Sequence, residues 1–209
     1  MMRGSLLENE SYCSKETAGV LREFGDKPEP GARGDIKEVV KGIVEGTLTP
    51  DSVALSDPAF YHQYGRTLER VETIALRKRW RTWMTEGLWI VGPANAGKSH
   101  MAFQGYHPDT HYIKNLNEEW WDGYRGQDTV ILNEFRGQIP FSELLDLVDK
   151  WPKCVKWRCR ESVPFLAKKV IISSVLWPKD VYRRQLESEP WAQFDRRFTV
   201  LELEARQLD

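Results

Sequence analysis

The sequence contains, at residues 92–99, the run Gly92-Pro93-Ala94-Asn95-Ala96-Gly97-Lys98-Ser99, which matches the pattern G-x-x-x-x-G-K-[ST]. Its two glycines let the backbone turn so that successive N–H groups point at an anion, and a helix that follows adds its positive N-terminal end. In this geometry Lys98 reaches the β- and γ-phosphates of a nucleotide, while the Ser99 hydroxyl ligates Mg²⁺. The run therefore predicts a nucleoside triphosphate site to which all eight residues contribute.

Short apolar runs around this loop predict the strands of a sheet. One run, Leu88–Val91, comes directly before the loop, and helix-compatible sequence continues after it to Gln104. Three later runs have the same character: Thr129–Leu132, Val170–Ile172 and Phe198–Leu203. A helix is expected over Phe141–Trp151, where Pro152 ends it. Apolar strands that alternate with helices are typical of a parallel sheet covered on both faces, so residues 81–209 are predicted to form an α/β domain.

Three amphipathic helices are expected ahead of this domain, in residues 35–80. In the first, Asp35 is the expected N-cap, and apolar positions recur at spacings of three and four up to Gly46. A second helix starts at Pro50, and a third covers Pro58–Arg79. This region is interpreted as a small helical bundle.

The composition limits the kinds of partner that the chain can have. Thirty Lys and Arg residues against 31 Asp and Glu residues give the 209-residue chain a formal net charge of −1, so any nucleic-acid site has to be a local basic surface. No apolar run is long enough for a transmembrane helix, and no secretory signal is expected at the start. The three cysteines form no C-x-x-C pair, which argues against a zinc site or a disulfide framework and fits a reducing compartment.

Polar side chains follow the strand predicted at residues 129–132, where a nucleotide site needs them. An acidic residue in this place holds the metal ion, and an adjacent acid orients the attacking water. Glu134 is the candidate both for orienting the attacking water and for binding the metal ion. Asn133 occupies the place of a metal-shell aspartate. An amide supplies no negative charge, although it can hydrogen-bond a metal-bound water. The alternative is a buried strand that simply ends in polar residues.

Four segments, taken in order and spacing, resemble one protein family. They are the loop at residues 92–99, Trp120-Trp121-Asp122-Gly123-Tyr124-Arg125-Gly126, Asn133-Glu134-Phe135-Arg136-Gly137 and Val163-Pro164-Phe165-Leu166. Together they resemble the replication initiator protein, Rep, of circular single-stranded DNA viruses such as circoviruses. The closest resemblance is to its superfamily 3 helicase domain, an AAA+-like P-loop NTPase, over about residues 87–198.

The resemblance implies an enzyme that uses ATP and Mg²⁺ to move on single-stranded DNA in the host nucleus. Residues 35–80 are then an oligomerisation bundle, and six copies form a ring around one strand. A motor of this class completes each ATP site with an arginine from the adjacent subunit, and Arg196 or Arg197 matches the family's late arginine pair. Surface arginines without this role are the alternative.

The family also has a hairpin that contacts DNA in the central channel of the ring. Its counterpart is the stretch at residues 156–162, which contains three cations and a tryptophan but no glycine. The residues expected to hold phosphates or to stack on a base are Lys156, Trp157, Arg158 and Arg160. The alternative is a solvated basic hairpin with Trp157 packed on a neighbour. For Trp120 and Trp121, a core or subunit contact is favoured over base stacking.

The sequence departs from the family at two places that matter for ATP hydrolysis. One is Asn133. The other is the strand end Ser173-Ser174-Val175, where the family has an asparagine whose amide contacts the γ-phosphate and the attacking water. Valine cannot make that hydrogen bond, and Ser174 is the candidate for a partial replacement. ATP binding is therefore expected, whereas hydrolysis is open.

A motif near the N-terminus extends the resemblance. The run Tyr12-Cys13-Ser14-Lys15 is similar to the last motif of the family's endonuclease domain, in which the tyrosine attacks a DNA phosphodiester. The histidine pair that holds a metal ion in that domain has no counterpart before Tyr12. We therefore expect residues 1–34 to be a remnant of an endonuclease domain and a linker, Tyr12 to be a relic nucleophile, and nicking by this chain alone to be absent.

Three functions remain in comparison. The first is the ATP-driven helicase portion of a Rep. The second is a truncated or decayed Rep that binds nucleotide, DNA or full-length Rep without being a motor, in keeping with Asn133 and Val175. The third is a superfamily 3 RNA helicase of an RNA virus, against which the motif at Tyr12 argues. The basic residues Arg77–Arg81 are interpreted as a nuclear-import signal, a DNA-facing patch or a solvated helix end.

Overall fold

The computed structural model describes residues 34–183 and 191–205. The endonuclease-like motif at Tyr12 lies outside the described residues. The chain divides into two compact units, residues 1–38 and 39–209. Apart from the first residues of helix α2, all elements below belong to the second unit. In the described part of the chain, no helix is both long and apolar enough to cross a membrane.

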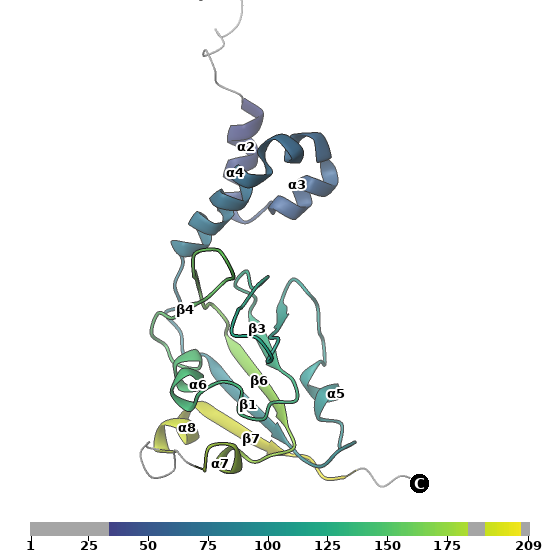
Figure 1. Ribbon diagram of the computed structural model, residues 1–209, viewed down its shortest axis with the longest axis vertical. Coiled ribbons are helices and arrows are strands. Elements are labelled where there is room, and N and C mark those ends of the chain that lie inside the picture. Colours follow the sequence, from purple (N-terminus) through teal and green to yellow (C-terminus); the bar gives the residue numbers. More distant parts are fainter. Residues whose placement is uncertain (1–33, 184–190, 206–209) are drawn as a thin grey trace, which may run out of the picture. The chain divides into compact units, whose positions relative to one another are not determined.

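A five-stranded parallel sheet lies in the second unit (Figure 1). Its strands are β1 (Glu86–Val91), β2 (His111–Ile113), β3 (Thr129–Leu132), β6 (Lys169–Ser174) and β7 (Phe198–Glu202). They lie in the order β2-β3-β6-β1-β7, and every neighbouring pair is parallel. The predicted parallel sheet is confirmed, and the four apolar runs are strands in it. β2 is an additional strand that the apolar runs do not predict.

Helices cover both faces of the sheet, as predicted. Four of them flank it: α5 (Lys98–Ala102), α6 (Phe141–Leu147), α7 (Pro178–Val181) and α8 (Trp191–Arg197). α5 lies on one face, and the other three lie on the opposite face (Figure 1). Side chains of β1 alternate between the faces: Trp89 and Val91 pack with α6 and α8, whereas Ile90 packs with Ala102 of α5. Because both faces are buried, the strands carry continuous apolar runs.

Helix α6 ends at Leu147 and not at Trp151, where the sequence predicts its end. The side chain of Arg81 donates hydrogen bonds to the carbonyl oxygens of Asp146, Leu147 and Trp151. A guanidinium can satisfy the free carbonyls at a helix end in place of further helical hydrogen bonds. Arg81 is only 2% exposed, so the interpretation of Arg77–Arg81 as a surface signal or DNA-facing patch does not hold for this residue.

The three helices expected ahead of the sheet are present: α2 (Gly34–Glu45), α3 (Pro50–Ser56) and α4 (Pro58–Arg77). α2 begins at Gly34, so Asp35 lies in its first turn and not at the N-cap, and its Oδ1 accepts a hydrogen bond from the Ile36 amide. Thr49 and Asp57 cap α3 and α4, and a proline follows each cap. The small core between the three helices consists of Ile43, Val53 and Leu68.

Candidate nucleotide site and nucleic-acid interface

The loop at residues 92–99 joins β1 to α5 and has the backbone that phosphate binding requires. Gly97 has a φ of +89° and Asn95 a φ of +64°, so the chain turns through the left-handed region at both residues. Gly92 is needed for a different reason, because a Cβ there would lie 2.4 Å from the carbonyl oxygen of Leu203. The segment after β7 therefore packs directly against the start of the loop, and only glycine leaves room for it.

Lys98 lies inside this loop and not in solvent. The residue is 5% exposed, and its Nζ donates a 2.7 Å hydrogen bond to the carbonyl oxygen of Pro93. An ammonium group has three donors, so it can keep this carbonyl and still donate to phosphate oxygens. The loop thus presents a desolvated cation at the place where the sequence predicts the β- and γ-phosphates.

Ser99 and Asn133 meet where β3 ends. The Ser99 hydroxyl donates to Asn133 Oδ1 at 2.9 Å, and the Ser173 hydroxyl donates to the same oxygen at 2.6 Å. Ser173 also accepts a 3.1 Å hydrogen bond from the backbone amide of Glu134. The structure therefore brings Ser99, predicted to ligate the metal ion, into contact with Asn133, which occupies the place of a metal-shell aspartate. It adds Ser173, a link that the sequence analysis does not single out.

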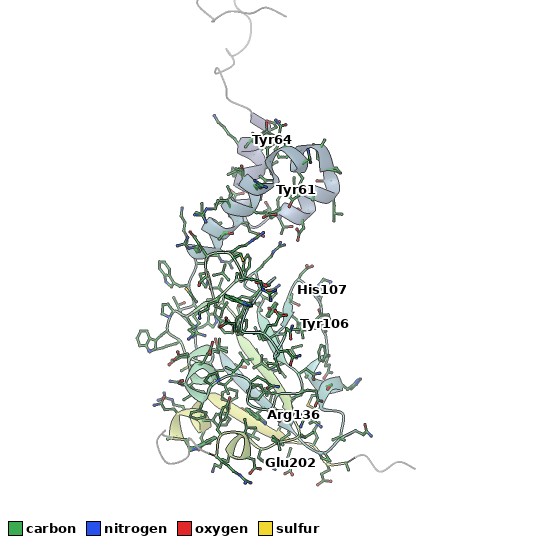
Figure 2. All side chains as sticks on the ribbon, viewed as in Figure 1. Tyr61, Tyr64, Tyr106, His107, Arg136 and Glu202 are labelled. Carbon is green, nitrogen blue, oxygen red and sulfur yellow. The ribbon has the colours of Figure 1, made fainter. Side chains whose placement is uncertain are left out.

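Glu134 has a left-handed backbone conformation, with a φ of +56°. Such a conformation costs a non-glycine residue free energy and is concentrated at functional sites. The carboxylate is half-exposed, and its Oε2 lies 3.5 Å from Nη2 of Arg136. Arg136, labelled in Figure 2, is not among the site residues that the sequence predicts. The carboxylate expected to orient water thus lies near a guanidinium of its own loop.

A cavity of about 440 Å³ lies between these segments. Six of the predicted residues line it and so share one space of the size that small ligands occupy: Ala94, Asn95, Gly97, Lys98, Ser99 and Glu134. Two residues that the sequence does not single out also line it, His100 and Arg136. Val175 lines it as well, which puts an apolar side chain where the family has an amide. The cavity therefore has the groups for binding phosphates and lacks one group that would contact the attacking water.

Ser174, the candidate to replace that amide, is turned away from the cavity. Its hydroxyl donates to the carbonyl oxygen of Phe135 at 2.7 Å and accepts from the amide of Leu176 at 3.0 Å, and the residue is fully buried. Side chains alternate along β6, so Ser174 points to the same face as Ile172, which packs in the large core cluster. The hydroxyl on the nucleotide side of the strand belongs to Ser173.

The two late arginines lie in different environments. Arg197 forms a largely buried ion pair with Asp149 at 2.8 Å and donates to the carbonyl oxygen of Leu145 at 3.0 Å. Arg196 is exposed. Arg197 is therefore bound within its own chain, and Arg196 is the exposed member of the pair.

The predicted basic hairpin is present: β4 (Cys154–Val155) pairs with β5 (Val163–Pro164), and residues 156–162 form its loop. Trp157 is 6% exposed, so the packed alternative holds for this side chain and base stacking does not. Lys156 is exposed.

Arg158, also in the hairpin loop, is held by acidic groups. Its backbone amide donates to Asp122 Oδ1 at 2.7 Å, and its guanidinium pairs with Glu118. These partners come from the segment before β3, so they fix the loop against the sheet domain. The side chain is about half-exposed, and an exposed ion pair of this kind is weak enough for a phosphate to compete with it.

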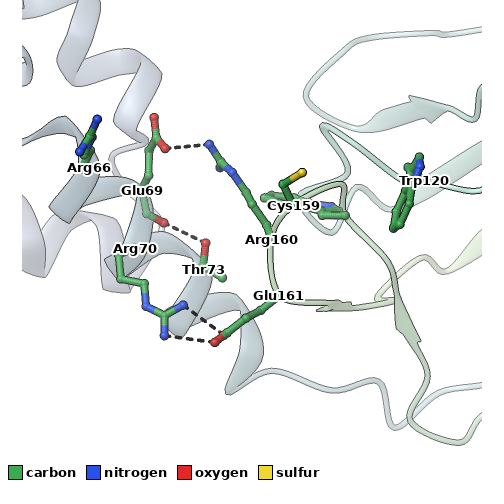
Figure 3. A pocket seen from close by; sticks show the side chains of 9 residues that line it. Arg66, Glu69, Arg70, Thr73, Trp120, Cys159, Arg160 and Glu161 are labelled. Atoms are coloured by element: carbon green, nitrogen blue, oxygen red, sulfur yellow. Dashed lines mark hydrogen bonds and ion pairs between the residues drawn. The ribbon is translucent and has the colours of Figure 1, made fainter.

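Two further ion-paired residues tie the hairpin loop to helix α4, and we call this group the α4 clasp (Figure 3). Arg160 donates to Glu69 of α4 at 2.8 Å. Glu161 pairs with Arg70 at 3.1 Å and also with Arg77 of the same helix. The hydrogen bonds from Arg70 hold the pKa of the Glu161 carboxyl below its ordinary value. The loop expected to contact DNA is therefore tied to α4 by the clasp.

The two tryptophans of the Trp120–Gly126 segment differ in burial. Trp121 is 3% exposed and stacks on Tyr112 with ring centroids 5.8 Å apart, so the predicted core contact is confirmed for it. Trp120 is half-buried and lines a second cavity, next to the hairpin loop.

Comparison with known proteins agrees with this geometry. Residues 88–176 match the sequence profile of a family described as RNA helicase. The replication-associated protein of goose circovirus is 35% identical over 185 residues, which are 88% of this chain and 61% of that protein. The replication-associated protein of porcine circovirus 1 is 35% identical over 181 residues, 86% of this chain and 57% of that protein.

This chain is a relative of the circovirus replication-associated proteins. It spans about three fifths of the length of these relatives. Among solved structures, the apo C-terminal region of NrS-1 has a TM-score of 0.42 and 18% identity, and the match covers 80% of this chain and 38% of that chain. The match to the helicase profile covers the part of this chain that contains the loop at residues 92–99, most of strand β1 and the strands β3 and β6.

Proposed function

We propose that this chain is the ATP-dependent DNA helicase portion of a viral-type replication initiator. The observation that carries the proposal is that Lys98, Ser99 and Glu134 line one cavity at the end of a parallel sheet. These groups supply what ATP hydrolysis requires: a cation for the phosphates, a ligand for the metal ion and a carboxylate for the water. The relation to the circovirus proteins supports DNA as the polymer on which the enzyme moves.

Mg²⁺ would be held at oxygens that the structure already brings together. Ser99 Oγ and Asn133 Oδ1 lie 2.9 Å apart. Mg²⁺ keeps several waters and takes few protein ligands besides the phosphates of the substrate, so this small set fits it. The bound ion would neutralise charge on the phosphates. Because Asn133 is neutral, the negative charge of the shell has to come from the triphosphate and Glu134.

Two charged groups would act on the terminal phosphate. Glu134 orients the attacking water, and its contact with Arg136 joins two half-exposed groups, so a bound phosphate can draw the guanidinium away. Arg196 reaches the ATP of an adjacent subunit, because it is exposed while Arg197 is buried in its own chain. A ring of six copies is the assembly that we propose. Val44 and Leu55, which are 59% and 86% exposed, give residues 35–80 an apolar surface for it.

A second candidate function is nucleotide binding without turnover. The observation in its favour is Val175, which lines the cavity without offering a hydrogen bond to the attacking water. Such a chain would bind nucleotide and DNA, or join rings of full-length Rep as a passive subunit. For either function we propose the host nucleus as the compartment, by relation to the circovirus proteins.

Replacing Glu134 with glutamine distinguishes the two functions. We expect steady-state ATP hydrolysis to fall about a hundredfold, because the amide keeps the size of the side chain but cannot accept a proton. ATP affinity should change little. Phosphate release is measured with and without single-stranded DNA, and Glu202→Gln, an exposed glutamate on β7, is the control. If the wild-type chain releases no more phosphate than Glu134→Gln under either condition, the motor is excluded and the binding module remains.

We further propose that Lys156, Arg158 and Arg160 contact the DNA backbone, in competition with the acids that now hold the two arginines. Replacing Glu69 with glutamine should therefore raise the affinity for single-stranded DNA about threefold at low salt, since an exposed ion pair is worth no more than about 1 kcal/mol. The measurement is the anisotropy of a labelled oligonucleotide. The control is Glu45→Gln, which makes the same charge change on α2 and releases Lys41. An equal gain in both variants would indicate bulk charge and contradict the role of the clasp.

A further inference from the structure

A second cavity, of about 620 Å³, lies between helix α4 and the hairpin loop (Figure 3). Its walls carry the cations Arg66, Arg70 and Arg160 and the indole of Trp120. Figure 3 shows Arg66 and Trp120 at opposite ends of this group, with Arg160 between them. A ligand that used both ends would therefore have to be extended.

The charges of the cavity wall do not cancel. Glu69 pairs with Arg160, and Glu161 pairs with Arg70, so two acids compensate two of the three arginines. Arg66 has no ion pair among residues 34–183 and 191–205. One cation is thus left for a ligand, and one phosphodiester carries one negative charge.

The backbone of Trp120 is held in position by the side chain of Lys114. Lys114 donates to the carbonyl oxygens of Trp120 at 2.9 Å and of Asn115 at 2.6 Å, and it also bonds that of Glu118. Lys114 is 4% exposed, and burial lowers the pKa of its ammonium group. The backbone of the segment that carries Trp120 is therefore fixed by a buried cation, and the half-buried indole of Trp120 lines the cavity.

We propose that this cavity binds a short stretch of single-stranded DNA, with one base stacked on Trp120 and the backbone directed toward Arg66. The inference rests on the proposed DNA-binding function and extends it to residues of α4 and of the Trp120–Gly126 segment, outside the hairpin. An extended polymer fits the separation of the two ends better than a free nucleotide does. The cavity also lacks the backbone turn of glycine residues that holds a triphosphate at residues 92–99.

The test compares two labelled oligomers of equal length, oligo(dT) and an abasic strand, by anisotropy at low salt. Trp120→Ala should weaken binding of oligo(dT) about fivefold and leave the abasic strand unaffected, because only the former has bases to stack. Trp120→Phe should restore the binding. Arg66→Ala should weaken binding of both strands about threefold. Trp80→Ala is the control for loss of an exposed tryptophan, and Arg183→Ala for loss of an exposed cation.

The outcomes separate this site from the DNA-binding function itself. If Trp120→Ala and Arg66→Ala bind both strands like the wild type while Lys156→Ala binds them more weakly, the cavity is not a DNA site although the hairpin is. If Trp120→Ala weakens both strands equally and also lowers the melting temperature, Trp120 is structural and the proposal is wrong. If the wild-type chain binds neither strand, the proposal and the DNA-binding function both fail.

Discussion

Replacing Lys98 with alanine is expected to weaken ATP binding about a hundredfold or more. The Lys98 ammonium is buried in the loop at residues 92–99, next to the carbonyl oxygen of Pro93. A hydrogen bond between charged groups is worth about 1.5–3 kcal/mol, and about 1.4 kcal/mol corresponds to a factor of ten in affinity. Loss of two such bonds to the β- and γ-phosphates therefore gives the expected factor.

ATP affinity is measured by calorimetric titration, with the melting temperature recorded for each protein. The matched control is Lys168→Ala, which removes an exposed lysine that pairs with Asp128 at 2.9 Å and lies outside the cavity. The control should bind ATP like the wild type. A folded Lys98→Ala protein with wild-type ATP affinity would show that the loop is not the nucleotide site.

The sheet could be predicted from the sequence because its strands are buried on both faces. Continuous apolar runs such as Thr129–Leu132 and Val170–Ile172 have no other place in a chain of mixed composition. Strand β2 was not predicted because it is only three residues long and lies at the edge of the sheet, where His111 and Tyr112 are half-buried. An edge strand needs no apolar run, so composition gives no signal for it.

The loop at residues 92–99 was predictable for a different reason: phosphate binding depends mostly on backbone geometry and on two side chains adjacent in sequence. The side-chain directions at the end of β6 were also within reach. Ile172 packs in the large core cluster and Ile171 on the opposite face, so counting by two assigns Ser174 to the core side and Ser173 to the nucleotide side.

Ion pairs between distant segments were not predictable from the sequence. Arg197 meets Asp149, and Arg160 meets Glu69, across separations in sequence at which no local spacing rule applies. A basic run in a sequence therefore does not show which cations are free. In the hairpin loop, Arg158 and Arg160, which the sequence predicts to contact DNA, are paired with acids. We therefore expect removal of an acid, Glu69, to raise DNA affinity.

Arg81 is the clearest case of a cation whose role depends on tertiary structure. In the sequence it ends the basic run Arg77–Arg81, yet in the structure it lies against Phe165, with its guanidinium carbon 5.5 Å from the ring centroid. Burial lowers the pKa of the Arg81 guanidinium. Hydrogen bonds offset the cost of burying the guanidinium. Three go to the carbonyl oxygens of Asp146 and Leu147 in α6 and of Trp151 after it, and a fourth goes to the hydroxyl of Thr85.

Replacing Arg81 with alanine is expected to lower the free energy of unfolding by about 3–5 kcal/mol. The substitution removes the donor of the buried carbonyl oxygen of Leu147, and a buried group without a partner costs about 1–3 kcal/mol. It also removes the part-buried hydrogen bonds to the carbonyl oxygens of Asp146 and Trp151, each worth about 0.5–1.5 kcal/mol. In a domain of this size the expected loss corresponds to a fall in melting temperature of about 10 °C. Urea unfolding followed by circular dichroism measures the free energy, and Arg79→Ala, an exposed arginine two residues earlier, is the control.

Arg81→Lys separates the hydrogen bonds from the charge. Lysine keeps the positive charge but presents its donors from a single nitrogen, so it cannot reach three carbonyls that the planar guanidinium contacts from three nitrogens. We expect its stability to lie between those of the wild type and the alanine variant. If Arg81→Lys is as stable as the wild type, the charge alone matters and the carbonyl contacts do not hold the end of α6. If the free energy of unfolding of Arg81→Ala is less than about 1 kcal/mol below that of the wild type, the prediction is wrong. In that case water or a rearranged segment after α6 satisfies the carbonyl oxygens in place of Arg81.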